Sequence, residues 1–134
     1  MAEEQCVFCR IANDDPWHQV FYSDQHAAAF LDLSQAGRGH TLVAPRQHAV
    51  DIFDIDADGF AAVARTVHRV AQRLDERLQP EGLTIFQSNR AAGWQDVFHL
   101  HVHLVPRWTG DALTRPWEGS SGQQDLQELT DLLR

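Results

Sequence analysis

The sequence contains no lysine, so all eleven of its basic side chains are arginines, against nineteen acidic side chains. The formal net charge of −8 argues against duplex DNA as a partner, because proteins that bind duplex DNA present a basic face to the phosphates. No apolar run approaches the roughly 20 residues that cross a bilayer, and the acidic start of the chain is unlike a basic signal peptide. We therefore expect a cytoplasmic protein that binds neither DNA nor a membrane.

Cysteine is also scarce, because the chain has only Cys6 and Cys9. In a cytoplasmic protein such a pair is expected to be two thiols or two metal ligands, since disulfides belong to oxidising compartments. The length of 134 residues suits one domain. The content of 43% hydrophobic and 22% charged residues is ordinary for a globular protein. We expect a single domain over residues 1–134.

The predicted elements are those of a mixed α and β domain. Short segments rich in β-branched, aromatic or small apolar residues predict five strands, at 19–23, 27–33, 40–44, 83–88 and 97–105. Apolar residues recur at spacings of three and four from Asp56 to Gln79 and predict one long helix, which Pro80 and Gly82 end. Near the C-terminus, leucines at helical spacing predict a short amphipathic helix: Leu126, Leu129, Leu132 and Leu133.

Histidine alternates with apolar residues in the last predicted strand, at His99, His101 and His103. Since successive side chains of a strand point to opposite faces, these imidazoles are expected to share one face, about 6.5–7 Å apart. A single histidine would suit an ordinary half-exposed strand, but three in register, out of eight in the chain, indicate chemistry. Two kinds of chemistry stay open: the row of histidines binds a metal ion, or one histidine is a nucleophile that its neighbours assist.

The other cluster is the Cys-x-x-Cys pair, Cys6 and Cys9, whose spacing lets two thiolates share one zinc ion. A closed structural site needs four ligands, and His48 and His99 are the candidates for the other two. The alternatives are a redox dithiol of the thioredoxin type and a plain pair of reduced thiols. The redox motif normally lies between a strand and a helix in a βαβ pattern, which the predicted elements lack.

Several separated segments together resemble the histidine triad (HIT) superfamily, over about residues 6–107. The segments are residues 6–11, 30–33 and 40–48, and the triad itself, His99-Leu100-His101-Val102-His103-Leu104-Val105. The likeness is strongest to the Hint-like and bacterial HIT hydrolase branches. The remaining residues, 108–134, are expected to form a tail that contains the short helix.

The resemblance implies an α+β subunit with a five-stranded antiparallel sheet, one long helix and a short C-terminal helix. Two subunits are expected to pair into a homodimer with a ten-stranded sheet. The family binds a nucleoside monophosphate unit, usually a purine nucleotide, and hydrolyses or transfers it. The resemblance also implies a structural zinc ion on Cys6, Cys9, His48 and His99, and no catalytic cofactor is expected.

Residue roles follow from the same resemblance. His101 matches the nucleophile, and His40 and His103 match its active-site companions. Asp32 matches the carboxylate that grips the ribose hydroxyls. The other positions that match nucleotide-binding residues are Val7, Phe8, Ile11, Phe30, Leu33 and Leu42 around the base, and Asn89 and Gln95 in the phosphate loop.

The chain departs from the family pattern at Trp94 and Asp96. Many Hint-like members have glycine where Trp94 stands, and the large ring could cover the site or stack on a base. Asp96, also expected at the nucleotide, replaces a hydroxyl that assists the leaving group in relatives. A carboxylate beside a phosphate is repulsive unless it is protonated or turned away, so the preferred leaving group stays open.

The expected chemistry is attack by a neutral imidazole, which is an effective nucleophile near pH 7 because its ordinary pKa is about 6.5. If the Nδ1–H group of His101 donates to a backbone carbonyl, Nε2 keeps its lone pair for phosphorus. Attack would give a nucleotidyl-histidine that water hydrolyses. Phosphoramidates, adenylates and dinucleoside polyphosphates all stay open as substrates. So do two other functions: a nucleotide-binding regulatory module with negligible turnover, and a hydrolase with catalytic zinc on the histidine row.

Overall fold

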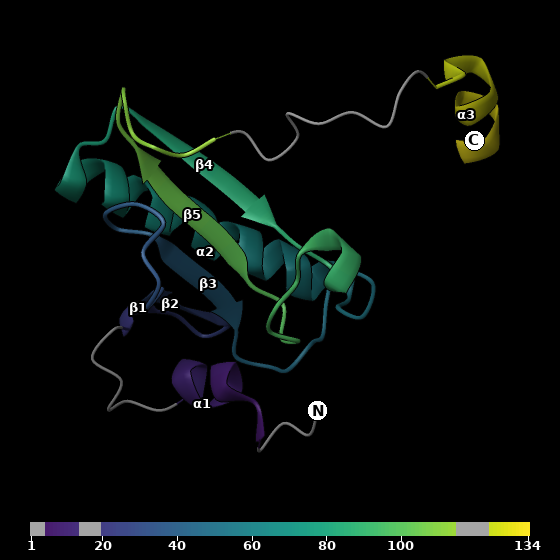
Figure 1. The fold of residues 1–134 in the computed structure, drawn as a ribbon. Helices are drawn as coiled ribbons and strands as arrows, with labels where there is room; N and C mark the ends of the chain where they lie inside the picture. The colour runs from purple at the N-terminus through teal and green to yellow at the C-terminus, as the bar shows by residue number, and fades with distance from the viewer. Residues whose placement is uncertain (1–4, 14–19, 115–123) are drawn as a thin grey trace.

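The computed structural model describes residues 5–13, 20–114 and 124–134, and its centre is a five-stranded antiparallel sheet (Figure 1). The strands are β1 (Val20–Ser23), β2 (Ala27–Leu31), β3 (Thr41–Pro45), β4 (Gly82–Gln87) and β5 (Val102–Arg107). They lie in the order β1-β2-β3-β5-β4, and each neighbouring pair is antiparallel. The predicted α+β fold with five antiparallel strands is confirmed.

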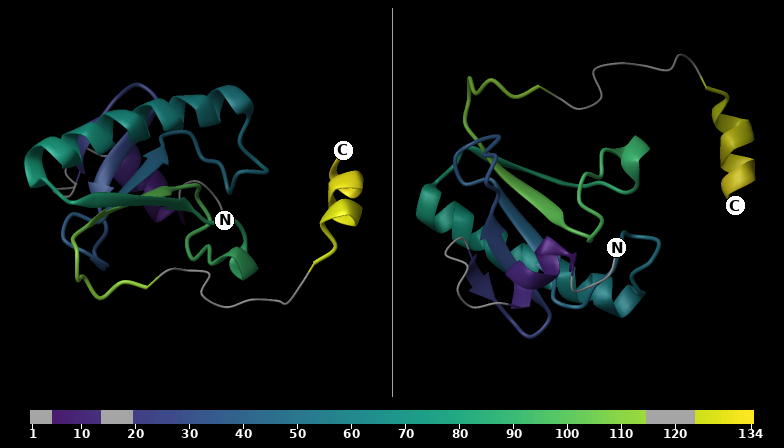
Figure 2. Two further views of the ribbon diagram at one scale, coloured as in Figure 1. Left: turned by 90° about the horizontal axis from the view of Figure 1, so that it is seen from above. Right: turned by 60° about the horizontal axis from the view of Figure 1, so that its bottom comes forward.

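The helices within the described residues are α1 (Val7–Asn13), α2 (Ala57–Leu78) and α3 (Leu126–Leu133), with a short 3-10 helix, η2 (Ala91–Gly93), between β4 and β5. Helix α2 covers one face of the sheet, and α1 lies beside β2 and β3 (Figure 2). Helix α3 stands apart from the sheet in each view and has no buried residue, and it confirms the short helix predicted in the tail. None of the described helices is long and apolar enough to cross a membrane.

Alternation along the central strands divides the core into two clusters on opposite faces. The cluster under α2 consists of Ala27, Ala29, Val43, Val63, Val70, Leu74, Leu100, Val102 and Leu104. The cluster under α1 uses the intervening positions of the same strands and consists of Cys6, Phe8, Phe30, Leu42 and Ala44. His103 lies between Val102 and Leu104 in β5, so its side chain emerges on the α1 face.

Helix α2 has the ends that its sequence predicts. The Asp56 carboxylate accepts a hydrogen bond from the Gly59 N–H at 2.6 Å and so caps the N-terminus. Gln79 adopts the left-handed conformation at φ 51°, and its N–H donates to the Asp75 carbonyl. The hydrophobic periodicity therefore identified both the helix and its boundaries.

Several strand boundaries and one helix differ from the prediction, and the predicted second strand ends at Leu31 and not at residue 33. Strand β5 begins at Val102 and not at residue 97, because residues 97–100 bend and the Leu100 N–H bonds to the Ala49 carbonyl at 2.7 Å. Strand β3 includes Pro45, which lies where β3 pairs with β2 alone, beyond its pairing with β5. Helix α1 was not expected, because seven residues are too short for a helical periodicity. Gln19, the expected start of the first strand, lies outside the described residues.

Candidate functional site

The three triad histidines do not form one row on one strand. Residues 97–101 precede β5, and the side chain of His99 lies against the two cysteines, whereas His101 and His103 line a cavity under α1. The three side chains do point to the α1 side, as predicted, since Phe8 of α1 contacts the rings of His99 and His101, and Leu100, Val102 and Leu104 lie in the cluster under α2. The expectation of one continuous strand is wrong, because only His103 lies within β5. The bend at 97–100 places His99 beside the two cysteines and leaves His101 and His103 at the cavity.

The first group joins the N-terminal segment to the core through four ligand atoms. His99 Nδ1 lies 3.3 Å from Cys6 Sγ, 3.4 Å from Cys9 Sγ and 3.2 Å from His48 Nδ1, and His48 Nδ1 lies 3.3 Å from Cys9 Sγ. A tetrahedron with ordinary zinc–sulfur and zinc–nitrogen bonds has edges of about 3.3–3.8 Å. The four predicted ligands thus stand together at the separations that one zinc ion needs.

The groups around these atoms also suit a metal. His99 Nε2 lies 2.9 Å from the Pro45 carbonyl oxygen, so Nε2–H donates there and Nδ1 keeps its lone pair. Burial lowers the pKa of His99 to about 4, which keeps the ring neutral as a ligand must be. The Cys9 N–H donates to Cys6 Sγ at 3.4 Å. The donor set of two thiolates and two imidazoles is typical of structural zinc.

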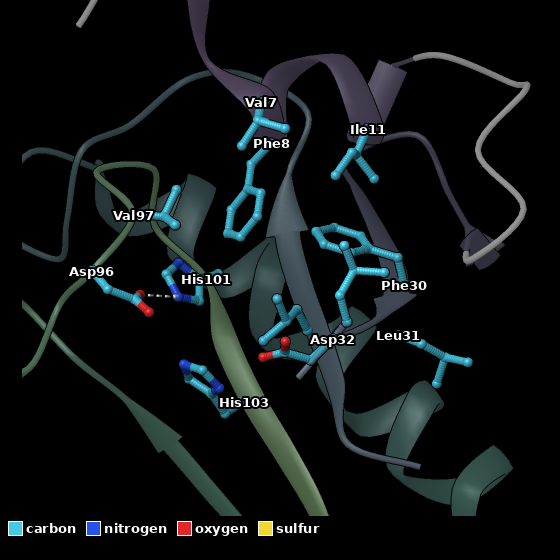
Figure 3. A pocket seen from close by; sticks show the side chains of 12 residues that line it. Val7, Phe8, Ile11, Phe30, Leu31, Asp32, Asp96, Val97, His101 and His103 are labelled. Carbon is cyan, nitrogen blue, oxygen red and sulfur yellow. Dashed lines mark ion pairs between the residues drawn. The ribbon is translucent and has the colours of Figure 1, made fainter. Parts of the chain in front are cut away.

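The second group surrounds a cavity of about 250 Å³ between α1 and the sheet (Figure 3). Its apolar wall comes from α1 and from β2 and β3, and its polar side carries two carboxylates and two imidazoles (Figure 3). The cavity is lined by Val7, Phe8, Ile11, Phe30, Leu31, Asp32, Leu33, Leu42, Asp96, Val97, His101 and His103. Every predicted base-pocket residue lines it, together with Asp32 and Asp96.

His101 is buried at the floor of this cavity with one ring nitrogen occupied. Its Nδ1 lies 2.7 Å from the His99 carbonyl oxygen, so Nδ1–H donates and Nε2 is left unprotonated. The ring of Phe8 meets the ring of His101 edge to face, with centroids 5.0 Å apart. Burial lowers the pKa of His101, and the opposing effects of Asp96 and Asp32 do not cancel it. The ring is therefore neutral at pH 7, with its Nε2 lone pair available.

His103 has the opposite tautomer because of a chain of hydrogen bonds. The Ala36 N–H donates to His40 Nδ1 at 3.2 Å, so His40 carries its proton on Nε2. His40 Nε2 lies 2.9 Å from His103 Nδ1 and donates to it, which places the His103 proton on Nε2. Burial lowers the pKa of His103 to about 4. His103 thus presents an N–H donor beside the lone pair of His101.

Asp32 stands at the end of β2, at the border of the cavity. Its Oδ1 accepts a hydrogen bond from the Ser34 N–H at 2.8 Å, and its Oδ2 lies 3.6 Å from His40 Nε2. The carboxylate is 22% exposed and so remains open to a ligand in the cavity. Such an oxygen pair is able to accept hydrogen bonds from two neighbouring hydroxyls.

Two predicted phosphate-loop residues do not line the cavity. Gln95 is buried, and its side chain accepts from the Arg90 N–H and donates to the carbonyls of Val50 and Val97. Asn89 Oδ1 accepts from the Ile52 N–H and from the side-chain amide of Gln87. In this structure both amides hold the loop 89–97 in shape. The exposed Trp94 lies outside the cavity lining as well.

Sequence reasoning missed three residues of the site. Leu31 and Val97 line the cavity, and the ring of Phe86 stacks on His103 with centroids 4.2 Å apart. Leu31 follows a predicted base-pocket residue and precedes Asp32. Phe86 is opposite His103 in the pairing of β4 with β5, a register that no local pattern indicates.

Comparison with known proteins identifies the family. The HIT domain family model matches residues 15–110 of this chain. Protein hit of Bacillus subtilis is 34% identical over 132 residues, which make up 95% of this chain and 90% of that protein. A Zn-bound histidine triad family protein from Mycobacterium smegmatis has 37% sequence identity to this chain, and its crystal structure matches with a TM-score of 0.77 over 84% of this chain and 82% of that protein. A HIT family hydrolase from Legionella pneumophila has 28% sequence identity, and its crystal structure matches with a TM-score of 0.69 over 83% of this chain and 97% of that protein. The triad segment, the cavity beside it and these matches agree, and the chain belongs to the HIT family.

Proposed function

We propose that this protein is a nucleotide hydrolase or transferase that acts on nucleoside monophosphate derivatives through a nucleotidyl-histidine intermediate on His101. The observation that carries the proposal is the hydrogen bond from His101 Nδ1 to the His99 carbonyl, which leaves Nε2 as a neutral nucleophile in the cavity. The similar Legionella pneumophila protein is described as a HIT family hydrolase, which supports the same class of reaction.

The cavity suits one nucleoside monophosphate unit. Its apolar wall of Val7, Phe8, Ile11 and Phe30 offers a flat base, preferably a purine, a surface to pack against. Asp32 at the border is placed to accept the ribose hydroxyls. A nucleotide bound in this way has its phosphate beside His101 and His103, on the polar side of the cavity (Figure 3).

The reaction proceeds in two displacements. His101 Nε2 forms a bond to phosphorus, the bond from phosphorus to the leaving group breaks, and the leaving atom takes the electron pair and a proton from solvent. Water then forms a bond to phosphorus, the bond from phosphorus to Nε2 breaks, and the imidazole regains its lone pair while the proton from water goes to solvent. A transferase uses another acceptor in place of water.

Charge on the phosphoryl oxygens must be stabilised without lysine. The His103 Nε2–H is the donor that the hydrogen-bond chain from Ala36 through His40 provides. Donation from a neutral ring is short in range and depends on orientation. His40 therefore acts as a positioning residue, since it fixes which nitrogen of His103 carries the proton.

In this proposal, zinc is a structural ion that cross-links two parts of the chain. Cys6, Cys9, His48 and His99 would hold the ion, which supplies a cross-link and no reaction step. The M. smegmatis relative is described as zinc-bound, in agreement with this assignment. The cross-link joins α1, which carries part of the base wall, to the residue whose carbonyl orients His101.

We further propose a homodimer in which two sheets join into one of ten strands. Among the described strands, β4 lies at an edge next to exposed apolar side chains. Ile85 is 49% exposed and Trp94 is 63% exposed, and a second copy of the chain would cover them. Sedimentation of the wild-type protein and of Ile85→Glu checks this, with a dimer expected for the first and a monomer for the second.

The catalytic proposal is tested by intact-mass analysis after brief mixing with an activated adenylate. The wild-type protein and His103→Ala are expected to gain the mass of one adenylyl group, which is AMP less one water, and His101→Gly is expected to gain none. A regulatory module would bind AMP without any mass gain. A hydrolase with catalytic zinc would lose activity at once on chelation and would form no adduct. Either result would overturn the proposal.

A further inference from the structure

We propose that Asp96 selects substrates by the charge of the leaving group, favouring leaving groups that carry a positive charge over those that carry a negative charge. This inference rests on the proposed function and narrows it to a substrate class. The positive charge is either that of the departing nitrogen, which leaves as an ammonium ion, or that of an ammonium group elsewhere in the leaving group. The resemblance implies a hydroxyl at this position in many Hint-like proteins, where this chain has a carboxylate.

Asp96 points toward the reacting centre. Its Oδ1 lies 3.8 Å from His101 Nε2, the atom assigned to attack phosphorus, and the side chain lines the cavity (Figure 3). The Asp96 carboxylate is therefore not turned away from the phosphate, so its orientation does not relieve the repulsion described above. Its side chain is 82% exposed, so water partly screens its charge.

The backbone on both sides of Asp96 is held in place. The buried Gln95 side chain donates to the carbonyls of Val50 and Val97 at 2.6 and 3.1 Å and accepts from the Arg90 N–H at 2.7 Å. Val97 on the other side lines the cavity. The Asp96 carboxylate therefore belongs to a segment that these hydrogen bonds hold beside the cavity.

Among the described residues that line the cavity, no positive side chain offsets this carboxylate. These residues include two carboxylates, Asp32 and Asp96, and two neutral imidazoles, but no arginine or lysine. Arg90, whose backbone N–H donates to the Gln95 side chain, places its guanidinium over the Phe53 ring, 4.2 Å from the ring centroid. The reacting phosphate is accepted through hydrogen bonds, but a second phosphate beside it meets a negative field.

The size of the effect follows from distance and screening. In a reactive complex phosphorus lies about 3–3.5 Å from the attacking nitrogen, so the atoms bonded to it lie within several ångströms of the Asp96 oxygen. At about 5 Å, one unit of charge changes the rate by about fourfold in a dielectric like water, and by more where water is partly excluded. Since Asp96 is largely exposed, we expect about three- to tenfold for each unit of leaving-group charge.

The chemistry of departure acts in the same direction. When the phosphorus–nitrogen bond of a phosphoramidate breaks, nitrogen takes the electron pair and protons from solvent and leaves as an ammonium ion. Its positive charge develops beside the carboxylate. When a phosphorus–oxygen–phosphorus link breaks, the departing phosphate gains negative charge in the same place. Asp96 therefore stabilises the first departure and opposes the second.

The test uses three adenosine phosphoramidates with one linker length, ending in an ammonium, a methyl or a carboxylate group. The steady-state kcat/KM is measured for each with the wild-type protein, with Asp96→Asn, and with Glu76→Gln as control. Glu76 is exposed on α2 and absent from the cavity, so its substitution removes the same charge elsewhere. We expect the wild-type protein and Glu76→Gln to prefer the cationic over the anionic substrate by about ten- to hundredfold.

In Asp96→Asn that preference is expected to fall to within about threefold, with faster turnover of the neutral and anionic substrates. A preference that stays unchanged in Asp96→Asn, while all three substrates turn over, overturns the inference and leaves the proposed function standing. If the wild-type protein turns over none of the three, the proposed function is contradicted, and the inference with it.

Discussion

Replacing Phe8 by alanine tests whether α1 is held to the sheet by the same contacts that form the base wall. Phe8 is only 8% exposed, and its ring meets Phe30 and His101 edge to face at centroid distances of 5.3 and 5.0 Å. Buried Phe→Ala substitutions cost about 3–5 kcal/mol. Because Phe8 also opens onto the cavity, neighbouring groups and water can occupy part of the vacated space. We therefore expect about 3 kcal/mol of lost stability.

For a chain of this length, about 3 kcal/mol corresponds to a fall in Tm of about 12 °C. The assay is thermal unfolding followed by circular dichroism, with AMP affinity measured by calorimetry on the folded variant. AMP binding is expected to weaken at least tenfold, because the ring that would face the base is gone and His101 loses its edge-to-face contact.

Leu33→Ala is the matched control. Leu33 lines the same cavity but is 82% exposed, so its truncation is expected to change the stability by less than about 0.5 kcal/mol. If Phe8→Ala lowers the Tm no more than Leu33→Ala does, then α1 is not held by these contacts and the reasoning is refuted.

Two further predictions concern pH and metal. Burial holds the pKa of His103 at about 4 in the folded protein, below the ordinary 6.5, so its contribution to stability is present above about pH 6.5 and is lost as the pH falls toward 4. Urea midpoints should drop over that range by more in the wild-type protein than in His103→Gln, and parallel curves would refute the assignment. Chelation of zinc is expected to raise amide exchange in residues 7–13, because Cys6 and Cys9 bind this helix to His48 and His99, and activity should decline only with stability. Unchanged exchange there, or immediate loss of activity with an intact fold, would contradict a structural ion.

The fold could be predicted where an element depends on its own residues. Helix α2 has a long apolar periodicity that begins at Asp56 and is ended by Pro80 and Gly82, so sequence alone located it. Helix α1 is different, because Phe8 and Ala12 are its only buried residues and contacts with the sheet support it. The start of β5 also depends on a distant group, the Ala49 carbonyl that the Leu100 N–H reaches.

In the site, too, the features that depend on local sequence could be predicted, and those that depend on distant contacts could not. The spacing of the cysteines and the order of the family motifs predicted the four candidate metal ligands and the base wall, and the structure brings both groups together. The resemblance also assigned His99 to the metal ligands and His101 and His103 to the active site. The bend before β5 that accompanies this division could not be predicted, because it depends on the distant Ala49 carbonyl. Gln95 and Asn89 were expected at the phosphate. Their partners, such as the carbonyl of Val50, come from another part of the chain and cannot be read from local sequence.

The central claim is that His101 is neutral and that its Nε2 is unprotonated in the cavity. Nitrogen-15 NMR of histidine-labelled, nucleotide-free protein at pH 7 measures this directly, with the His101→Gly and His103→Ala spectra used for assignment. The hydrogen bonds predict a proton on Nδ1 and a bare Nε2 for His101, and the opposite tautomer for His103. A proton on Nε2 of His101, or a charged ring there, would contradict the proposed mechanism.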